Sequence, residues 1–192
     1  MAKEKLPTIV SVPCVAAFAW LSKPDSGKKY SDDKYKVTGV FDPAQDGVTE
    51  FLAKIEAAHE KARGKKKTES PVKDGDDKMD KDGKQKEEFK GKKLVTFKSK
   101  FAPQCLEKGV EGELPADRAP RSGDVIKVAF AMLPYEEGKN AGISLQMRAV
   151  KLLERRNRPD YSDAFGDEDD GDDTPAEKPA GNGGSKGAGG DF

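Results

Sequence analysis

Aromatic residues in this sequence stand close to lysines at several points along the chain. Trp20 is followed by Lys23, and Phe97 is followed directly by Lys98. Lysine ammonium groups bind phosphates, and exposed aromatic rings stack on nucleobases with about 1 to 3 kcal/mol per base. The pattern therefore predicts a surface that binds a nucleic acid strand, with Trp20, Phe97 and Tyr135 as stacking faces.

The cations predicted to contact phosphates come from the same stretches of the chain. They are Lys23, Lys36, Lys98, Lys100, Lys127 and Arg148. Every base has a ring face, so stacking of this kind predicts only a slight sequence preference. The electrostatics alone would fit single strands, duplex DNA or RNA.

No set of residues typical of an enzyme or a metal centre is evident. The sequence has no glycine loop ending in GK[ST] that would cradle a phosphate. Cys14, Cys105 and His59 are its only cysteines and histidine, too few for a zinc ligand set or a disulfide framework. We therefore expect no catalytic residue, no metal and no cofactor, and a reducing compartment.

Charge is distributed unevenly along the chain. Residues 160–192 hold ten Asp or Glu and two Lys, a net charge of −8. The whole chain has a formal net charge of zero, so residues 1–159 carry +8. A basic body favours a polyanionic partner, and an acidic tail imitates one. We expect the tail to compete with the partner for the basic surface.

Glycine-rich, acidic composition predicts that residues 158–192 form a disordered tail. The tail combines a block of acidic residues with a terminal Asp-Phe pair. These residues are Asp167, Glu168, Asp169, Asp170, Asp172, Asp173, Asp191 and Phe192.

Hydrophobic patterns predict the strands that must position the candidate residues. Residues 9–21 and 35–41 are expected to be early strands, and residues 94–101 alternate between a basic face and an apolar, aromatic face. Residues 124–135 and 143–153 are predicted to be two strands of a hairpin around a polar loop.

One amphipathic helix is predicted after the second strand. Apolar residues recur at three- and four-residue spacing from Val48 to Ala62, Asp46 is placed to cap the helix, and Gly64 follows its end. We interpret His59 as a partly buried helix residue, because the chain has no second histidine with which it could form a site.

These elements predict a mainly β fold, an OB-fold with a five-stranded antiparallel barrel and one helix. The domain is expected to span residues 1–157. Within it, the lysine-rich residues 64–93 have almost nothing to bury and are predicted to be a solvated, flexible insertion. The apolar run at residues 9–21 is broken by Pro13 and is shorter than the about twenty residues that cross a bilayer, so no membrane association is expected.

Several short matches, in order along the chain, resemble the single-stranded DNA-binding proteins of tailed bacteriophages, the gene 2.5 type. The matching segments are Met1–Lys3, Lys23–Asp25, Tyr35–Val37, His59–Glu60, Val95–Lys100, Gly123–Tyr135, Gly142–Leu153 and Gly190–Phe192. The chain departs from the family pattern at Gly181–Gly190, which is nearly uncharged and separates the acidic block from the terminal Phe192.

The resemblance implies an OB-fold and a role in phage DNA replication, recombination and repair in the cytoplasm of a bacterial host. It also implies single-stranded DNA as a partner and a possible homodimer. The acidic residues of the tail and Phe192 are expected to dock the phage DNA polymerase and primase-helicase. Two other functions stay open. The chain could be an acidic-tailed, chaperone-like protein that holds a basic protein partner, or an RNA-binding OB protein.

Overall fold

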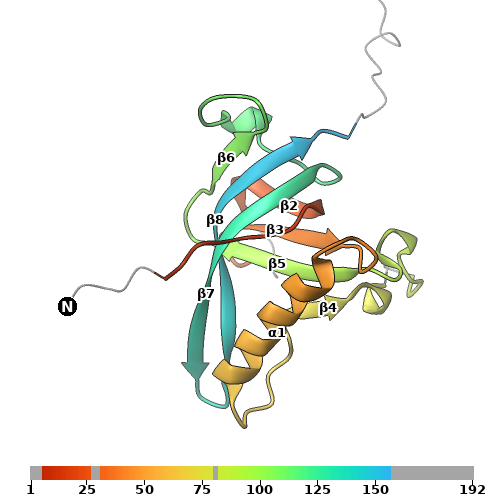
Figure 1. The fold of residues 1–192 in the computed structure, drawn as a ribbon, viewed down its shortest axis with the longest axis vertical. Coiled ribbons are helices and arrows are strands. Elements are labelled where there is room, and N and C mark those ends of the chain that lie inside the picture. Colours follow the sequence, from red (N-terminus) through yellow and green to blue (C-terminus); the bar gives the residue numbers. More distant parts are fainter. Residues whose placement is uncertain (1–5, 27–30, 80–81, 157–192) are drawn as a thin grey trace, which may run out of the picture. The chain divides into compact units, whose positions relative to one another are not determined.

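The computed structural model describes residues 6–26, 31–79 and 82–156 (Figure 1). The chain divides into two units, Met1–Arg156 and Asn157–Phe192. The second unit lies outside the described residues, and the predicted acidic tail with its docking residues lies there as well. Of the described helices, none is both long and apolar enough to cross a membrane.

Within the described residues, five strands close into a ring. Each strand pairs with two others in the order β2, β3, β5, β8, β7 and back to β2. The strands are β2 (Cys14–Asp25), β3 (Lys34–Phe41), β5 (Lys93–Ser99), β7 (Val125–Glu137) and β8 (Asn140–Glu154). The predicted five-stranded OB barrel is confirmed, with one difference: β5 and β8 pair in parallel, whereas the other ring neighbours are antiparallel.

Three short strands extend the sheet beyond the ring. β1 (Ile9–Val10) pairs with β7, β4 (Val72–Asp74) pairs with β5, and β6 (Gln104–Glu107) pairs with β8. The run 9–21, predicted to be one strand, is therefore divided between β1 and β2. Pro13 lies in the gap, where its missing N–H removes a donor from the ladder.

The barrel interior is packed with aromatic side chains. Phe41, Phe97 and Phe130 are fully buried, and the Phe97 and Phe130 ring centroids lie 4.9 Å apart. Phe51, from the helix, packs against Phe41 at 5.3 Å and against the edge of Phe130 at 6.0 Å. Such tilted and edge-on ring pairs stabilise a core beyond their buried area.

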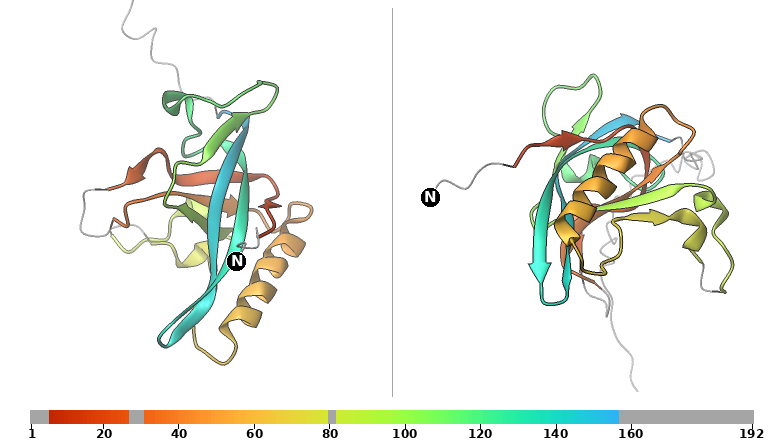
Figure 2. Two further views of the ribbon diagram at one scale, coloured as in Figure 1. Left: turned by 90° about the vertical axis from the view of Figure 1, so that its left-hand side faces the viewer. Right: turned by 60° about the horizontal axis from the view of Figure 1, so that its bottom comes forward.

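The helix α1 (Val48–Arg63) buries Val48, Leu52 and His59 on one face and lies beside the β7–β8 hairpin (Figures 1 and 2). The predicted helix is confirmed, but its predicted cap is wrong. Gly47 is the N-cap residue and no side chain caps the helix. Its backbone is left-handed, with φ of 77°, a conformation that favours glycine.

The β7–β8 hairpin is anchored to the helix through a close contact. His59 is buried, and its Nε2 lies 3.3 Å from the Thr68 carbonyl oxygen. A Cβ added at Gly142 of β8 would lie 2.5 Å from His59 Cε1, so only glycine fits there. The Ala141 N–H also donates to Thr68 Oγ1 at 3.0 Å. The residues after the helix thus hold the turn end of the hairpin, where Gly142 pairs with Tyr135.

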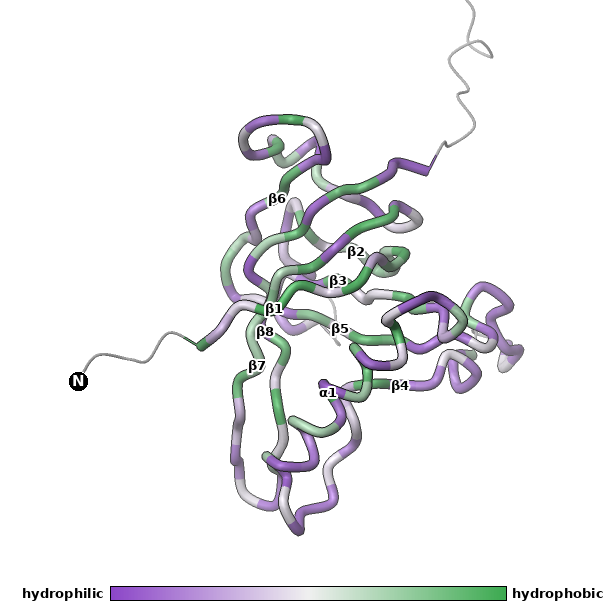
Figure 3. The backbone as a smooth tube through the Cα atoms, viewed as in Figure 1, coloured by the Kyte–Doolittle hydropathy of each residue, from purple (hydrophilic) through white to green (hydrophobic). Residues whose placement is uncertain are grey.

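The lysine-rich residues 64–93 differ from the predicted solvated insertion. Their strand β4 pairs with β5, and two short 3₁₀ helices follow, η1 (Gly75–Asp77) and η2 (Glu87–Phe89). Phe89 is only 4% exposed and packs against Val40 and Leu94. Figure 3 shows why composition misled here: the segment is mostly hydrophilic. One buried aromatic ring and backbone pairing hold it on the barrel.

Candidate nucleic-acid interface

A groove of about 260 Å³ lies on the outer face of the barrel, where residues from β2, β3, β5, the hairpin and the insertion meet. Thr38 and Thr96 border it and are opposite each other on β3 and β5. Their hydroxyl oxygens are 2.9 Å apart and hydrogen-bonded. Because these side chains are short, they leave an open channel over the sheet.

Two exposed aromatic side chains border the groove. Phe18 of β2 is 45% exposed, and Tyr135 of β7 is 39% exposed. Tyr135 is a predicted stacking residue, and the structure places it at the groove. The rings come from strands far apart in sequence, so only the folded barrel brings them to one surface.

Sequence reasoning missed Phe18. Cys14 and Ala16 of the same strand lie in the core, and strict alternation would also turn residue 18 inward. The pairing of β2 with β3 is irregular between Ala17 and Trp20, and Phe18 has a φ of 49°. This bulge turns the ring outward, and no local sequence signal indicates it.

The prediction that Phe97 is a stacking face is wrong. Phe97 has no exposed surface and packs on Phe130 in the core. Side chains alternate between the two faces of a strand, so Phe97 points inward while Lys98 points outward. Neighbours in sequence are here on opposite faces of β5.

Lys98 is the predicted cation that lines the groove. Its Nζ lies 2.6 Å from Asp32 Oδ2. On the adjacent strand β3, Lys36 is the direct partner of Lys98 and forms ion pairs with Asp25 and, at 3.6 Å, with Asp32. Two carboxylates therefore neutralise two cations beside the groove.

The pKa values follow from this pairing. Burial opposes the charged form of Asp32, but the hydrogen bond from Lys98 and the charges of Lys98, Lys36 and Lys34 outweigh it and lower the pKa of that carboxyl. The hydrogen bond to Asp25 raises the pKa of Lys36. Both shifts favour the charged forms of Asp32 and Lys36.

Two further groove cations come from the insertion. Lys73 and Lys78 line the groove, and Lys86 places its Nζ 5.5 Å from the centroid of the Phe18 ring. The many lysines of residues 64–93 are the sequence signal for these cations, but composition alone does not distinguish a solvated segment from one that packs on the barrel.

The other predicted site residues do not line this groove. Trp20 is half-buried on β2 and Lys23 is exposed on the same strand, while Lys100 is exposed just after β5. Lys127 is half-buried on β7. Arg148 of β8 donates to Thr8 Oγ1 and, at 3.0 Å, to the Leu6 carbonyl oxygen, so it anchors the N-terminal segment. No group of three or more potential metal ligands occurs among the described residues.

Comparisons with known proteins agree with this architecture. The fold is similar to a single-stranded DNA-binding protein from bacteriophage Enc34 in complex with ssDNA, with a TM-score of 0.60, 18% identity, and 79% of this chain and 87% of that chain covered. It is also similar to gp2.5, a single-stranded DNA-binding protein encoded by bacteriophage T7, with a TM-score of 0.60, 18% identity, and 85% and 97% covered. A search of curated proteins by sequence finds no match.

The resemblance to the gene 2.5 type of phage protein is thereby confirmed at the level of the fold. The sequence also matches a family model over residues 9–174, which is described as Enterobacter phage Enc34, ssDNA-binding protein. The match extends over the whole barrel and the insertion. This chain therefore belongs to the family of the Enterobacter phage Enc34 ssDNA-binding protein.

Proposed function

We propose that the protein binds single-stranded DNA without sequence preference in the groove bordered by Phe18 and Tyr135. The observation that carries the proposal is the meeting of two exposed rings and three lysines, Lys73, Lys78 and Lys98, at one open channel. Rings stack on the bases while ammonium groups bind the phosphates, the combination that single-strand binding requires.

The absence of sequence preference follows from the same residues. Each ring accepts any base. The two threonine hydroxyls on the channel floor bond to each other, which leaves them less free to read base edges. Membership of the Enc34 family, and the description of one similar structure as a complex with ssDNA, support single-stranded DNA as the ligand.

The proposed setting is phage DNA replication, recombination and repair in the cytoplasm of a bacterial host, as a binding protein without catalysis. The acidic tail would regulate this binding, because its charge of −8 offsets the +8 of the rest of the chain. We assign to Asp191 and Phe192 the docking of the phage DNA polymerase and primase-helicase. We also propose that the protein forms a homodimer. Light scattering, which gives the molar mass in solution, tests this.

A gel-shift panel with single-stranded DNA, duplex DNA and RNA at two salt concentrations tests the proposal. We expect the tightest binding to single-stranded DNA. If about four phosphates are neutralised, log K falls against log salt with a slope of about −3, because each phosphate on a single strand contributes about 0.7. Tighter binding to RNA would favour the RNA-binding alternative. Failure to bind any nucleic acid would favour the basic-protein partner.

A further inference from the structure

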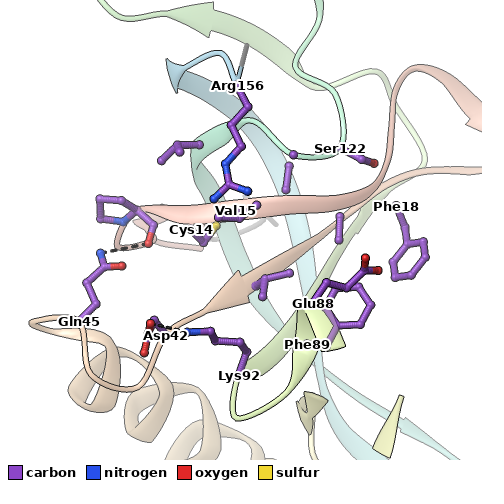
Figure 4. Close-up of a pocket in the computed structure, with 16 residues that line it drawn as sticks. Cys14, Val15, Phe18, Asp42, Gln45, Glu88, Phe89, Lys92, Ser122 and Arg156 are labelled. Carbon is purple, nitrogen blue, oxygen red and sulfur yellow. Dashed lines mark hydrogen bonds and ion pairs between the residues drawn. The ribbon is translucent and has the colours of Figure 1, made fainter. Parts of the chain in front are cut away.

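A second and larger cavity, of about 700 Å³, opens between β2, the insertion and the end of β8 (Figure 4). Its floor is apolar, formed by Val15, Ala17 and Val40 of the outer sheet face together with Phe89. Figure 4 shows the guanidinium of Arg156 reaching over Val15 from the opposite side. An apolar floor with a cation at its rim matches the shape and charge of a nucleotide.

Phe18 connects this cavity to the groove, because it borders both. Its ring centroid lies 5.8 Å from that of Phe89, with the planes tilted by 43°. Lys86 Nζ is 5.5 Å from the Phe18 centroid and 5.9 Å from the Phe89 centroid. The positive φ of Phe18 is uncommon for a bulky residue, and such conformations concentrate at functional sites.

Among the charged side chains that line the cavity, the Arg156 guanidinium is available to bind a ligand. Lys92 is paired with Asp42, and Glu88 is 3.9 Å from Lys86. By contrast, no described residue pairs with the Arg156 guanidinium. Within the described residues, only the backbone N–H of Arg156 is hydrogen-bonded, and it donates to Asp124 Oδ1 at 3.3 Å.

We propose that this cavity is a second nucleotide site, which continues the path of the bound strand across Phe18. A base lies on the apolar floor against Phe18, and its phosphate contacts Arg156. This inference rests on the proposed function, since the occupant is the same single strand. It predicts a binding site longer than the groove alone, with a distinct contribution from each cavity.

A series of oligothymidylates, each longer by one nucleotide, tests the proposal with the full-length chain. The fluorescence anisotropy of a fluorescein label on each oligothymidylate reports binding. The test variants are Arg156→Gln and Val15→Trp, which fills the floor. The matched control is Arg155→Gln, because Arg155 is adjacent in sequence but contacts Glu107 and the Arg118 carbonyl instead.

We expect both test variants to bind short oligothymidylates as the wild type does. On the long ones, Val15→Trp should bind about tenfold more weakly, the effect of one lost stacking contact of about 1.4 kcal/mol. Arg156→Gln should also bind the long ones more weakly, because one phosphate contact is lost. Arg155→Gln should match the wild type at every length. Equal affinity of all four proteins for long oligothymidylates would overturn the second site. If the wild type binds no oligothymidylate, the proposed function itself fails.

Photocrosslinking keeps the proposal testable should Val15→Trp fail to fold. A long oligonucleotide that carries 5-iodouracil at each position in turn is crosslinked to the wild type, and the adducts are mapped by mass spectrometry. Adducts on Phe89 or on Phe18 from two separate positions are expected. Adducts confined to Tyr135 and its neighbours would contradict a strand that reaches the second cavity.

Discussion

The Nζ of Lys98 lies 2.6 Å from Oδ2 of Asp32. Lys98 lines the groove that Tyr135 also borders. Asp32 also lies 3.6 Å from Lys36, the cross-strand partner of Lys98. A carboxylate therefore lies beside both lysines. If a DNA phosphate contacts these lysines, as the sequence predicts, binding exchanges this internal anion for an external one.

Substitution Asp32→Asn should strengthen binding to single-stranded DNA. The two lysines would no longer be partly neutralised, and we expect about threefold tighter binding, equivalent to about 0.7 kcal/mol for a partly exposed ion pair. The salt slope should steepen by up to about 0.7, the contribution of one phosphate. Fluorescence titration at several salt concentrations measures both quantities.

Glu107→Gln provides the control for that experiment. It also removes one carboxylate from an ion pair, with Arg118 and Arg155, but Glu107 does not line the groove. Affinity of Glu107→Gln should equal that of the wild type. An equal gain in both variants would show that net charge, rather than the position of Asp32, controls binding.

Phe18→Ala should weaken binding to single-stranded DNA by about tenfold, since one stacking face of about 1 to 3 kcal/mol is removed. Its thermal stability should remain near that of the wild type because the ring is 45% exposed. Phe101→Ala is the matched control, as Phe101 is 75% exposed and outside the groove. Undiminished binding by Phe18→Ala would remove Phe18 from the interface.

Phe97→Ala should instead act on the fold. The side chain has no exposed surface, and truncation of a buried phenylalanine costs about 3 to 5 kcal/mol of unfolding free energy. Urea unfolding followed by circular dichroism measures this loss. A stable Phe97→Ala protein with weakened DNA binding would restore the role predicted from the sequence.

Deletion of residues 160–192 should raise the affinity for single-stranded DNA by about tenfold, or about 1.4 kcal/mol, because a competing charge of −8 is removed. Deletion of residues 181–190 alone, which removes glycines and one lysine but no acidic residue, should not raise affinity. Unchanged or weaker binding after the longer deletion would refute competition by the tail.

Removal of Phe192 alone should leave DNA binding intact and weaken polymerase or helicase binding.

Gly142→Ala should destabilise the fold by about 1 to 3 kcal/mol, the usual cost of an overpacked site. The new methyl group would lie 2.5 Å from Cε1 and 2.7 Å from Nδ1 of the buried His59. Urea unfolding measures the loss, and Ser144→Ala, an exposed neighbour on the same strand, is the control. In the double variant with His59→Ala, the penalty of the added methyl should largely disappear if the clash is its cause.

Local pattern was sufficient for most of the elements. The alternation in residues 35–41 and 94–101 and the helical spacing after Val48 each reflect burial of one face, and β3, β5 and α1 follow within a few residues. The insertion was predicted less well. Its single buried ring, Phe89, has too little local context to indicate that it packs on the barrel.

The site depended on longer-range effects. Tyr135 and Lys98 were predicted and do meet at the groove, but Phe18 replaces Phe97 as its other exposed ring. The bulge in β2 turns Phe18 outward, and the strict alternation of β5 turns Phe97 inward. The bulge depends on the pairing of β2 with β3, whereas the alternation that buries Phe97 is already present in the sequence of residues 94–101.

The sequence by itself determined the charge division, the periodicity of the strands and helix, and the supply of lysines and aromatic rings, because these are properties of the chain before it folds. Only the tertiary structure decided which rings face solvent and which lysines are already paired with carboxylates. Closure of the ring through the parallel pairing of β5 and β8 sets the outer face on which they meet. Register between distant strands fixes these positions, and it is a consequence of core packing that no local pattern contains.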